Sequence, residues 1–286
     1  MYLTPNFTSK KMMKAKIGVL VIHGAGGATF TRQEKFIDKL QKYLEKQGID
    51  NSAIAFKHIN WYHPTESNQQ KIWDRLTDSG YRLKSNFLRK FIMFLVGDMV
   101  AYTGIPNRAS DTYRKTHEII FQHIREIQKK VPPQAPLVIL SSSLGTSLIT
   151  DYIWDRQKEN DPVMGDTPFE KLDTLTGLFL LGNNIPLYAA AYDPDQMEPV
   201  IFPPKNLDKK FLPFARFVNI FDRHDPLGFP LKPLNSKFDA VISNDIEMNV
   251  GSIFTSWNIG SHLAYWKSRR IRKLIGDYLI GLVKAI

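Results

Sequence analysis

A serine in a predicted tight turn is the residue of this sequence best suited to nucleophilic chemistry. Ser143 is the central residue of the run SSSLG at 141–145, which follows four apolar residues at 137–140. Such an apolar run predicts a strand buried on both faces, and the pattern from 144 to 155 predicts a helix. A strand, a turn with a central serine and a helix are the context of a nucleophile elbow. The sequence therefore indicates Ser143 as a candidate nucleophile.

The flanking positions agree with this interpretation except at one place. The elbow pattern is G-x-S-x-G, because strand and helix approach each other closely and the outer positions must be small. Gly145 meets this need fully, whereas Ser141 stands where the pattern has glycine and meets it in part. Serine-rich turns after strands also occur without catalysis, so Ser143 needs support from the rest of the chain.

A glycine-rich turn follows the first predicted strand, 17–22, and reads HGAGG from His23. Such a turn exposes backbone N–H groups to a negative group. The nucleotide-binding patterns G-x-G-x-x-G and G-x-x-x-x-G-K-[ST] are both missing, which argues against a phosphate loop. The turn is therefore interpreted as part of an oxyanion hole, with a plain tight turn as the alternative.

Carboxylates and a histidine occur late in the chain, again next to predicted strands or loops. Asp222 and Asp225 follow the predicted strand 214–221, and His262 lies in the loop 257–266. A serine hydroxyl is a poor nucleophile until a histidine accepts its proton, and a buried carboxylate fixes the histidine tautomer. Backbone N–H groups that hold the oxyanion each lower the barrier by about 3 kcal/mol. Together these groups point to acyl transfer.

The predicted elements would bring these groups together. Strands are predicted at 17–22, 52–61, 137–140, 175–181, 214–221 and within 238–250, and helices at 32–47, 110–130, 144–155 and 263–286. Strands that alternate with helices predict an α/β fold with a mostly parallel central sheet flanked by helices. Sites in such sheets form beyond the carboxyl ends of the strands, where the serine, the aspartates and the histidine turn would lie. We expect one domain over 1–286, with the long loop 182–213 as a candidate wall of the pocket.

A mostly helical insertion at about 66–103 separates two of the predicted strands. It is very apolar around 88–96 and carries basic residues beside that patch. One interpretation is a lid or an acyl-binding cap that contacts lipid. The other, which we favour, is an ordinary buried helix packed on the sheet, because Gly97 and Asp98 interrupt the apolar run.

These motifs resemble the α/β-hydrolase superfamily over nearly the whole chain, in the serine esterase and lipase-like members. The order serine, acid, histidine is the order that this family uses. The resemblance implies Ser143 as nucleophile, Asp225 as acid and His262 as base. It also implies an oxyanion hole formed by backbone N–H groups, those of Leu144 and of Ala25 or Gly26.

Each of these assignments has an alternative within the sequence. Asp222 is the alternative acid, with Asp225 then starting a turn before a proline. Asp193 and Asp195, which follow an earlier strand, are more distant alternatives. His224 lies between the two late aspartates, which makes a relay through it awkward.

Two further side chains also have alternative roles. His23 and Gly24 are expected to orient the turn, His23 rather than serving as a base. Ser142 as nucleophile would lack the glycine two residues later.

Composition limits the class of protein. The chain of 286 residues has 38 basic and 28 acidic residues, hence a net charge of 38 − 28 = +10. Dispersed charges without a nucleic-acid motif predict a solvated surface and no nucleic-acid partner. There is no cysteine, which excludes disulfides and thiolate metal sites. No apolar run approaches the roughly 20 residues that span a bilayer, so we expect a soluble cytoplasmic protein, with peripheral membrane contact and oligomeric state left open.

The sequence thus predicts a serine carboxylic-ester hydrolase that works through an acyl-enzyme and needs no metal or organic cofactor. The apolar insertion favours a small-molecule or lipid-like ester with an apolar acyl group. An acyltransferase or thioesterase with the same triad, and a non-catalytic binding module on this fold, are the alternatives.

Overall fold

The structure, a computed structural model, describes residues 15–25, 30–61, 66–78, 80, 82–103, 111–158, 165–190, 192–251 and 260–286. In this part of the chain six strands form one sheet in the order β2-β1-β3-β4-β5-β6, and every neighbouring pair is parallel. The strands are β1 (Ile17–Ile22), β2 (Ile54–Ile59), β3 (Leu137–Ser142), β4 (Leu175–Leu181), β5 (Arg216–Phe221) and β6 (Asn244–Glu247). The predicted α/β fold with a parallel central sheet is confirmed.

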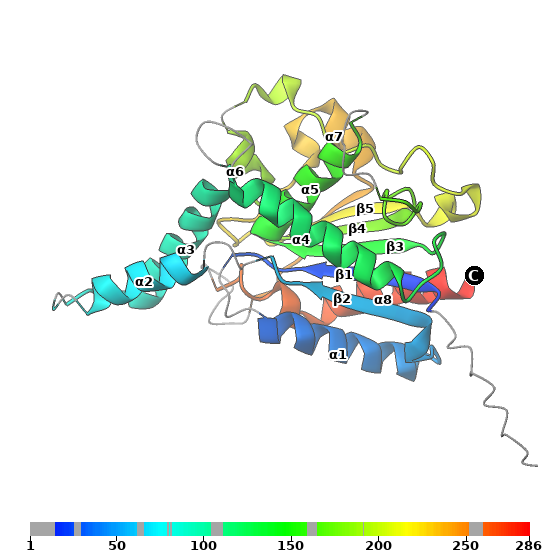
Figure 1. Cartoon of the computed structure of the whole chain (residues 1–286), viewed down its shortest axis with the longest axis horizontal. Helices are drawn as coiled ribbons and strands as arrows, with labels where there is room; N and C mark the ends of the chain where they lie inside the picture. The colour runs from blue at the N-terminus through cyan, green and yellow to red at the C-terminus, as the bar shows by residue number, and fades with distance from the viewer. Residues whose placement is uncertain are drawn as a thin grey trace, which may run out of the picture.

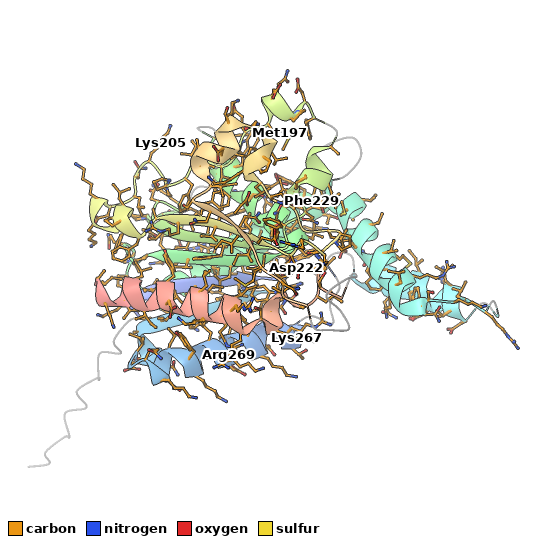
Figure 2. The ribbon with its side chains drawn as sticks, turned by 180° about the vertical axis from the view of Figure 1, so that it is seen from behind. Met197, Lys205, Asp222, Phe229, Lys267 and Arg269 are labelled. Atoms are coloured by element: carbon orange, nitrogen blue, oxygen red, sulfur yellow. The ribbon has the colours of Figure 1, made fainter. Side chains whose placement is uncertain are left out.

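Helices cover both faces of this sheet (Figure 1). The helices of the described residues are α1 (Phe30–Lys46), α2 (Glu66–Thr77), α3 (Asn86–Thr103), α4 (Asp111–Gln128), α5 (Leu144–Arg156), α6 (Ile185–Ala189), α7 (Ser236–Val241) and α8 (Arg269–Lys284). Short 3-10 helices lie at Asn51–Ala53, Pro194–Gln196, Lys209–Phe214, Lys232–Leu234 and Tyr265–Lys267. Helices α1 and α8 lie side by side against one face, as the view from behind shows (Figure 2), and α4 and α5 cover the other.

Strand β1 shows how the sequence builds the two halves of the core. Its side chains alternate between the faces with a period of two. Ile17, Val19 and Val21 join the apolar cluster under α1 and α8, whereas Leu20 and Ile22 join the cluster under α4 and α5. All six residues of β1 are buried, as are all of β3 and β4. Central strands buried on both faces therefore read as continuous apolar runs.

The predicted helical insertion at 66–103 contains α2 and α3, but they do not pack on the sheet in the way that we favoured. Helices α2 and α3 lie against each other and extend away from the body as an arm (Figure 1), and the main neighbour of α3 in the body is α4. Helix α3 also runs unbroken through Gly97 and Asp98. Asp98 is buried and its Oδ1 accepts a hydrogen bond of 2.6 Å from Gln69 Nε2 of α2, so this polar position joins the two helices.

Because the strands are parallel, their carboxyl ends meet at one edge of the sheet. β1 ends before His23, β3 before Ser143, β4 before Asn183 and β5 before Asp222. This edge is where sites form in open parallel sheets.

Candidate active site

Ser143 occupies a strained turn between β3 and α5. Its backbone has φ 51° and ψ −132°, a conformation that residues with a Cβ rarely adopt. Gly145, the last residue of the elbow pattern, has no room for a side chain. A Cβ there would lie 2.5 Å from the carbonyl oxygen of His23, the residue that follows β1. The turn therefore has the backbone strain and the tight packing that the elbow pattern predicts.

The strain at Ser143 predicts a stability difference between two variants that both lack the hydroxyl. Ser143→Gly removes the Cβ penalty of about 1–3 kcal/mol, whereas Ser143→Ala keeps it. The larger unfolded-state entropy of glycine offsets about 0.5–1 kcal/mol of this gain. We expect the free energy of unfolding of Ser143→Gly to exceed that of Ser143→Ala by about 1 kcal/mol in urea denaturation. Equal stability, or a more stable alanine variant, would contradict the strained turn.

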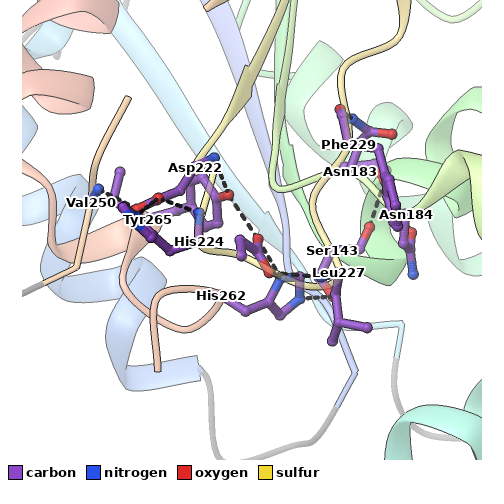
Figure 3. Close-up of polar contacts among 12 residues, drawn as sticks. Ser143, Asn183, Asn184, Asp222, His224, Leu227, Phe229, Val250, His262 and Tyr265 are labelled. Atoms are coloured by element: carbon purple, nitrogen blue, oxygen red, sulfur yellow. Dashed lines mark hydrogen bonds and ion pairs between the residues drawn. The ribbon is translucent and has the colours of Figure 1, made fainter. Parts of the chain in front are cut away.

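Ser143, His262 and Asp225 form one continuous chain of hydrogen bonds. Figure 3 labels Ser143 and His262 of this chain. His262 Nε2 lies 2.7 Å from Ser143 Oγ, and His262 Nδ1 lies 2.8 Å and 3.0 Å from the two carboxylate oxygens of Asp225. All three side chains are buried. The structure thus brings together the three residues that the sequence singled out, although 119 positions separate the serine from the histidine.

The carboxylate of Asp225 is held by two further donors. The backbone N–H of Leu227 donates to Oδ1 at 2.9 Å, and the hydroxyl of Tyr265 donates to Oδ2 at 2.8 Å. Tyr265 lies three residues after His262 in a short 3-10 helix, a spacing that places both side chains on one side of the turn. Sequence reasoning missed Tyr265. The spacing of a tyrosine three positions after a candidate histidine is the signal that could have found it.

Asp222, the alternative acid, binds backbone groups instead of His262. Its carboxylate accepts hydrogen bonds from the N–H of His224 at 3.0 Å and of Val250 at 2.7 Å, and it lies 3.2 Å from His224 Nδ1. Burial acts to raise the pKa of Asp222, but these N–H groups outweigh it and hold the pKa below its ordinary value. Asp222 therefore connects the loops that follow β5 and β6, and its carboxylate contacts the ring of His224 instead of that of His262.

Asp193 and Asp195, the more distant alternatives for the acid, lie in a short 3-10 turn. Asp193 is the N-cap of the 3-10 helix Pro194–Gln196, where its side chain accepts from the N–H of Asp195. Both aspartates are exposed. The hydrogen bond between them stabilises that 3-10 turn and does not involve His262.

A buried amide network fixes the loop that carries Asp225, and it was not foreseen. Asn183 Nδ2 donates to Asn219 Oδ1 at 2.7 Å, and Asn219 Nδ2 donates to Asp245 Oδ1 at 2.6 Å. The carbonyl of Phe229 accepts from both asparagines. Figure 3 labels Asn183 beside Phe229. These bonds join the loop after β4 and residues within β5 and β6 to the segment just after Asp225. Isolated asparagines in or after strands give no sequence pattern that predicts such a network.

One of the groups predicted for an oxyanion hole, the N–H of Leu144, directly follows Ser143, and the turn that would supply the second donor packs on the serine through Gly24. Leu144 is the first residue of α5, and N–H groups in a first helical turn have no acceptor within the helix. Gly24 packs directly on the serine, since a Cβ there would lie 2.5 Å from Ser143 Cβ. Ala25 follows in the same turn. Gly26, the alternative donor to Ala25, lies outside the described residues.

His23 is fully buried and supports the turn, as expected of an orienting residue. Its Nδ1 donates to the carbonyl of Gly24 at 2.6 Å, and its own carbonyl accepts from Trp61 Nε1 at 2.8 Å. The ring stacks on Trp61 with centroids 5.3 Å apart. Burial, with a smaller contribution from His58, lowers the pKa of His23 to about 3, so the ring is neutral at pH 7.

This lowered pKa predicts a loss of stability in acid. Below about pH 6.5 the unfolded chain protonates the imidazole of His23 while the folded chain does not, so the free energy of unfolding falls as the pH decreases toward 3. At pH 4.5 the loss from this residue amounts to roughly 3 kcal/mol. His23→Asn keeps a donor near Nδ1 and does not titrate. We expect its urea stability to fall less than that of the wild type between pH 7 and 4.5, and an equal fall would refute this role.

The neighbouring serines have other partners. Ser142 Oγ accepts a hydrogen bond of 2.8 Å from Trp266 Nε1, whereas His262 Nε2 contacts Ser143. Ser141 is buried in β3, and its Oγ lies 3.5 Å from the carbonyl of Phe179. A serine at the first elbow position is therefore accommodated against β4.

A cavity of about 480 Å³ lies along α5, beginning one helical turn after the nucleophile candidate at Ser147. Ser147 Oγ donates to Asn184 Oδ1 at 3.1 Å. Many of the lining side chains are aromatic: Tyr102, Tyr113, Trp154, Tyr188, Phe217 and Phe238. The residues at 192–200, from the long loop predicted as a pocket wall, complete one side. The cavity can thus take up an apolar group.

Two comparisons with known protein sequences give no match. No protein-family model and no curated protein sequence matches this chain. Within the described ranges, no group of three or more His, Asp or Glu side chains is arranged to hold a metal ion. No helix in those ranges is long and apolar enough to cross a membrane. The functional interpretation therefore rests on the geometry of the site.

Proposed function

We propose that the protein is a serine hydrolase of the α/β-hydrolase type that cleaves a carboxylic ester through an acyl-enzyme. The observation that carries this proposal is the unbroken chain from Asp225 through His262 to Ser143, with the serine on a strained strand-to-helix turn. The parallel sheet and the order serine, acid, histidine along the chain support it.

In the first half of the proposed reaction, Ser143 Oγ attacks the acyl carbon while His262 Nε2 accepts its proton. Their separation of 2.7 Å permits direct transfer. Asp225 holds Nδ1 protonated and stabilises the imidazolium that forms. The N–H of Leu144 and a donor from the turn at Ala25 or Gly26 stabilise the oxyanion. His262 then protonates the departing alcohol, and the acyl group remains on Ser143 as an ester.

In the second half, water replaces the alcohol. His262 removes a proton from the water, the hydroxide adds to the acyl carbon, and the C–O bond to Ser143 breaks. The proton returns to Ser143 Oγ, which releases the carboxylic acid and restores the starting state. The chain's own side chains supply every proton transfer in this cycle.

The aromatic cavity beside α5 favours an ester with an apolar acyl group. Its volume of about 480 Å³ lies within the range of small-molecule sites. Ser143 itself does not line the cavity, but Ser147, four residues later on α5, does. We infer that an acyl chain attached to Ser143 extends along α5 into this cavity.

Hydrolysis of a series of p-nitrophenyl esters tests this function. We expect turnover of medium-chain esters with kcat/KM above that of the acetate, and a carboxylic acid as the product even with a competing alcohol or thiol present. A preference of about tenfold for acetate would overturn the apolar acyl pocket. Dominant transfer to the added acceptor would replace hydrolysis by acyl transfer, and no turnover of any ester would contradict the function itself.

A further inference from the structure

The arm formed by α2 and α3 projects from the body, and side chains on the facing sides of the two helices hold it together. Lys90 lies over the rings of Trp73 and Phe94, and Gln69 bonds Asp98, so the two helices are joined by their facing sides. Figures 1 and 2 show both helices extending away from the sheet. Most of the outer surface of the arm is thus left without cover from the body.

Helix α3 carries an apolar stripe on that uncovered side. The stripe consists of four residues spaced four positions apart. Each step of four residues turns the helix by about 400°, so the four side chains lie within an arc of about 120°. Their exposed fractions are 41% for Leu88, 47% for Ile92, 48% for Val96 and 51% for Val100. Ile72 and Leu76 of α2 add two more exposed apolar side chains. Six such residues on one projecting element exceed the scattered apolar residues of an ordinary surface.

Basic residues lie at the outer end of the same arm. Between 71 and 90, across the outer ends of α2 and α3, there are six basic residues and two acidic residues, Asp74 and Asp78, so this end is net positive. Arg82, Lys84 and Arg89 are exposed, and Arg89 Nε donates to the backbone carbonyl of Lys84 at 2.8 Å. Arg89 lies on the side of α3 that carries the stripe, 60° from Ile92 by helical geometry at about 100° per residue. Apolar and cationic groups thus share one surface.

We propose that this surface docks on an anionic phospholipid bilayer. Exposed apolar side chains beside Arg and Lys are the features by which a helix lies in the membrane interface, and anionic headgroups neutralise the basic end. A second copy of the chain fits this surface less well, because each copy carries a net charge of +10 and docking would bring like charges together. The proposal concerns binding alone and does not depend on the activity of Ser143.

Flotation with lipid vesicles tests the docking. We expect the full chain to bind vesicles of phosphatidylcholine with about 30% phosphatidylglycerol, and to bind pure phosphatidylcholine at least about tenfold more weakly. Binding should weaken as salt rises. The double variant Ile92→Glu/Val96→Glu should lose at least about tenfold in binding constant, because its apolar stripe becomes charged. Arg82→Ala/Lys84→Ala should lose the preference for anionic vesicles.

Matched controls separate docking from general effects. Leu212 is 45% exposed on the body, so Leu212→Glu changes a comparable side chain away from the arm. Lys205→Ala/Lys267→Ala removes two exposed charges elsewhere. Both controls should bind as the wild type does.

Several outcomes would overturn the proposal. Wild-type protein that binds neither kind of vesicle is one, and equal binding by Ile92→Glu/Val96→Glu is another. If that variant fails to give a cooperative melt by circular dichroism, Leu88→Glu/Val100→Glu takes its place with the same expectation. A wild-type dimer by light scattering that dissociates on these substitutions would assign the stripe to a second copy.

Discussion

Replacing Ser143 with alanine is expected to lower kcat for ester hydrolysis by at least about 10³-fold, because no other group can form the acyl-enzyme. The change removes only the Oγ that lies 2.7 Å from His262 Nε2. The measurement is steady-state hydrolysis of the best p-nitrophenyl ester, with a thermal melt to establish that the variant is folded.

Ser142→Ala is the matched control for this experiment. It removes the neighbouring hydroxyl, whose partner is Trp266, and leaves the contact between Ser143 and His262 in place. We expect kcat within about tenfold of the wild type, since one buried hydrogen bond of about 1 kcal/mol is lost. Hydrolysis that survives in Ser143→Ala but fails in Ser142→Ala would place the nucleophile one residue earlier than the geometry does.

The second large effect is expected at Asp225. Asp225→Asn would present an amide to His262 Nδ1 and favour the wrong tautomer of the imidazole, so kcat should fall by about 10³–10⁴-fold. The substitution is nearly isosteric: the amide oxygen can keep the hydrogen bond from Leu227 N–H, and the amide nitrogen can donate to the hydroxyl oxygen of Tyr265. Steady-state kinetics of the same ester measures the effect.

Asp222→Asn makes the same chemical change three residues away. Because Asp222 binds the N–H groups of His224 and Val250, its amide would still accept a hydrogen bond from this loop. We expect kcat to change by less than about tenfold. The reverse pattern, a severe loss for Asp222→Asn and a mild one for Asp225→Asn, would make Asp222 the acid and contradict the assignment.

The strands of this fold were predictable because they are buried on both faces. β1 and β4 were predicted with the bounds that the structure has, since continuous apolar runs bounded by glycine or polar residues leave little choice. The irregular segment 182–213 was less predictable. It contains the five-residue helix α6 and two 3-10 helices, which are too short for a periodic pattern.

The arm shows where apolar periodicity gives the wrong tertiary placement. A strongly apolar helix favours burial, so we expected α3 on the sheet. The residues that are buried, such as Phe94 and Asp98, instead face α2 and the base of the arm, and the stripe at 88–100 remains exposed. Sequence periodicity finds the faces of a helix but does not say which of them the rest of the chain covers.

The candidate site could be predicted in part for a physical reason. Ser143 and Asp222 to Asp225 follow strands, and parallel strands bring their carboxyl ends to one edge. Choosing Asp225 over Asp222 needs the fold of the loop, because only there does one carboxylate meet His262. The supports from Tyr265 and the Asn183–Asn219–Asp245 network depend on contacts between distant segments, which single residues do not reveal.

Labelling with a fluorophosphonate probe, followed by mass spectrometry of the modified peptide, tests the central claim most directly. Such a probe phosphonylates a serine only where a base has activated its hydroxyl. We predict one adduct on Ser143 in the wild type and in Ser142→Ala, and none in Ser143→Ala. A folded wild type that takes up no probe, or an adduct that persists in Ser143→Ala, would contradict an activated nucleophile at this position.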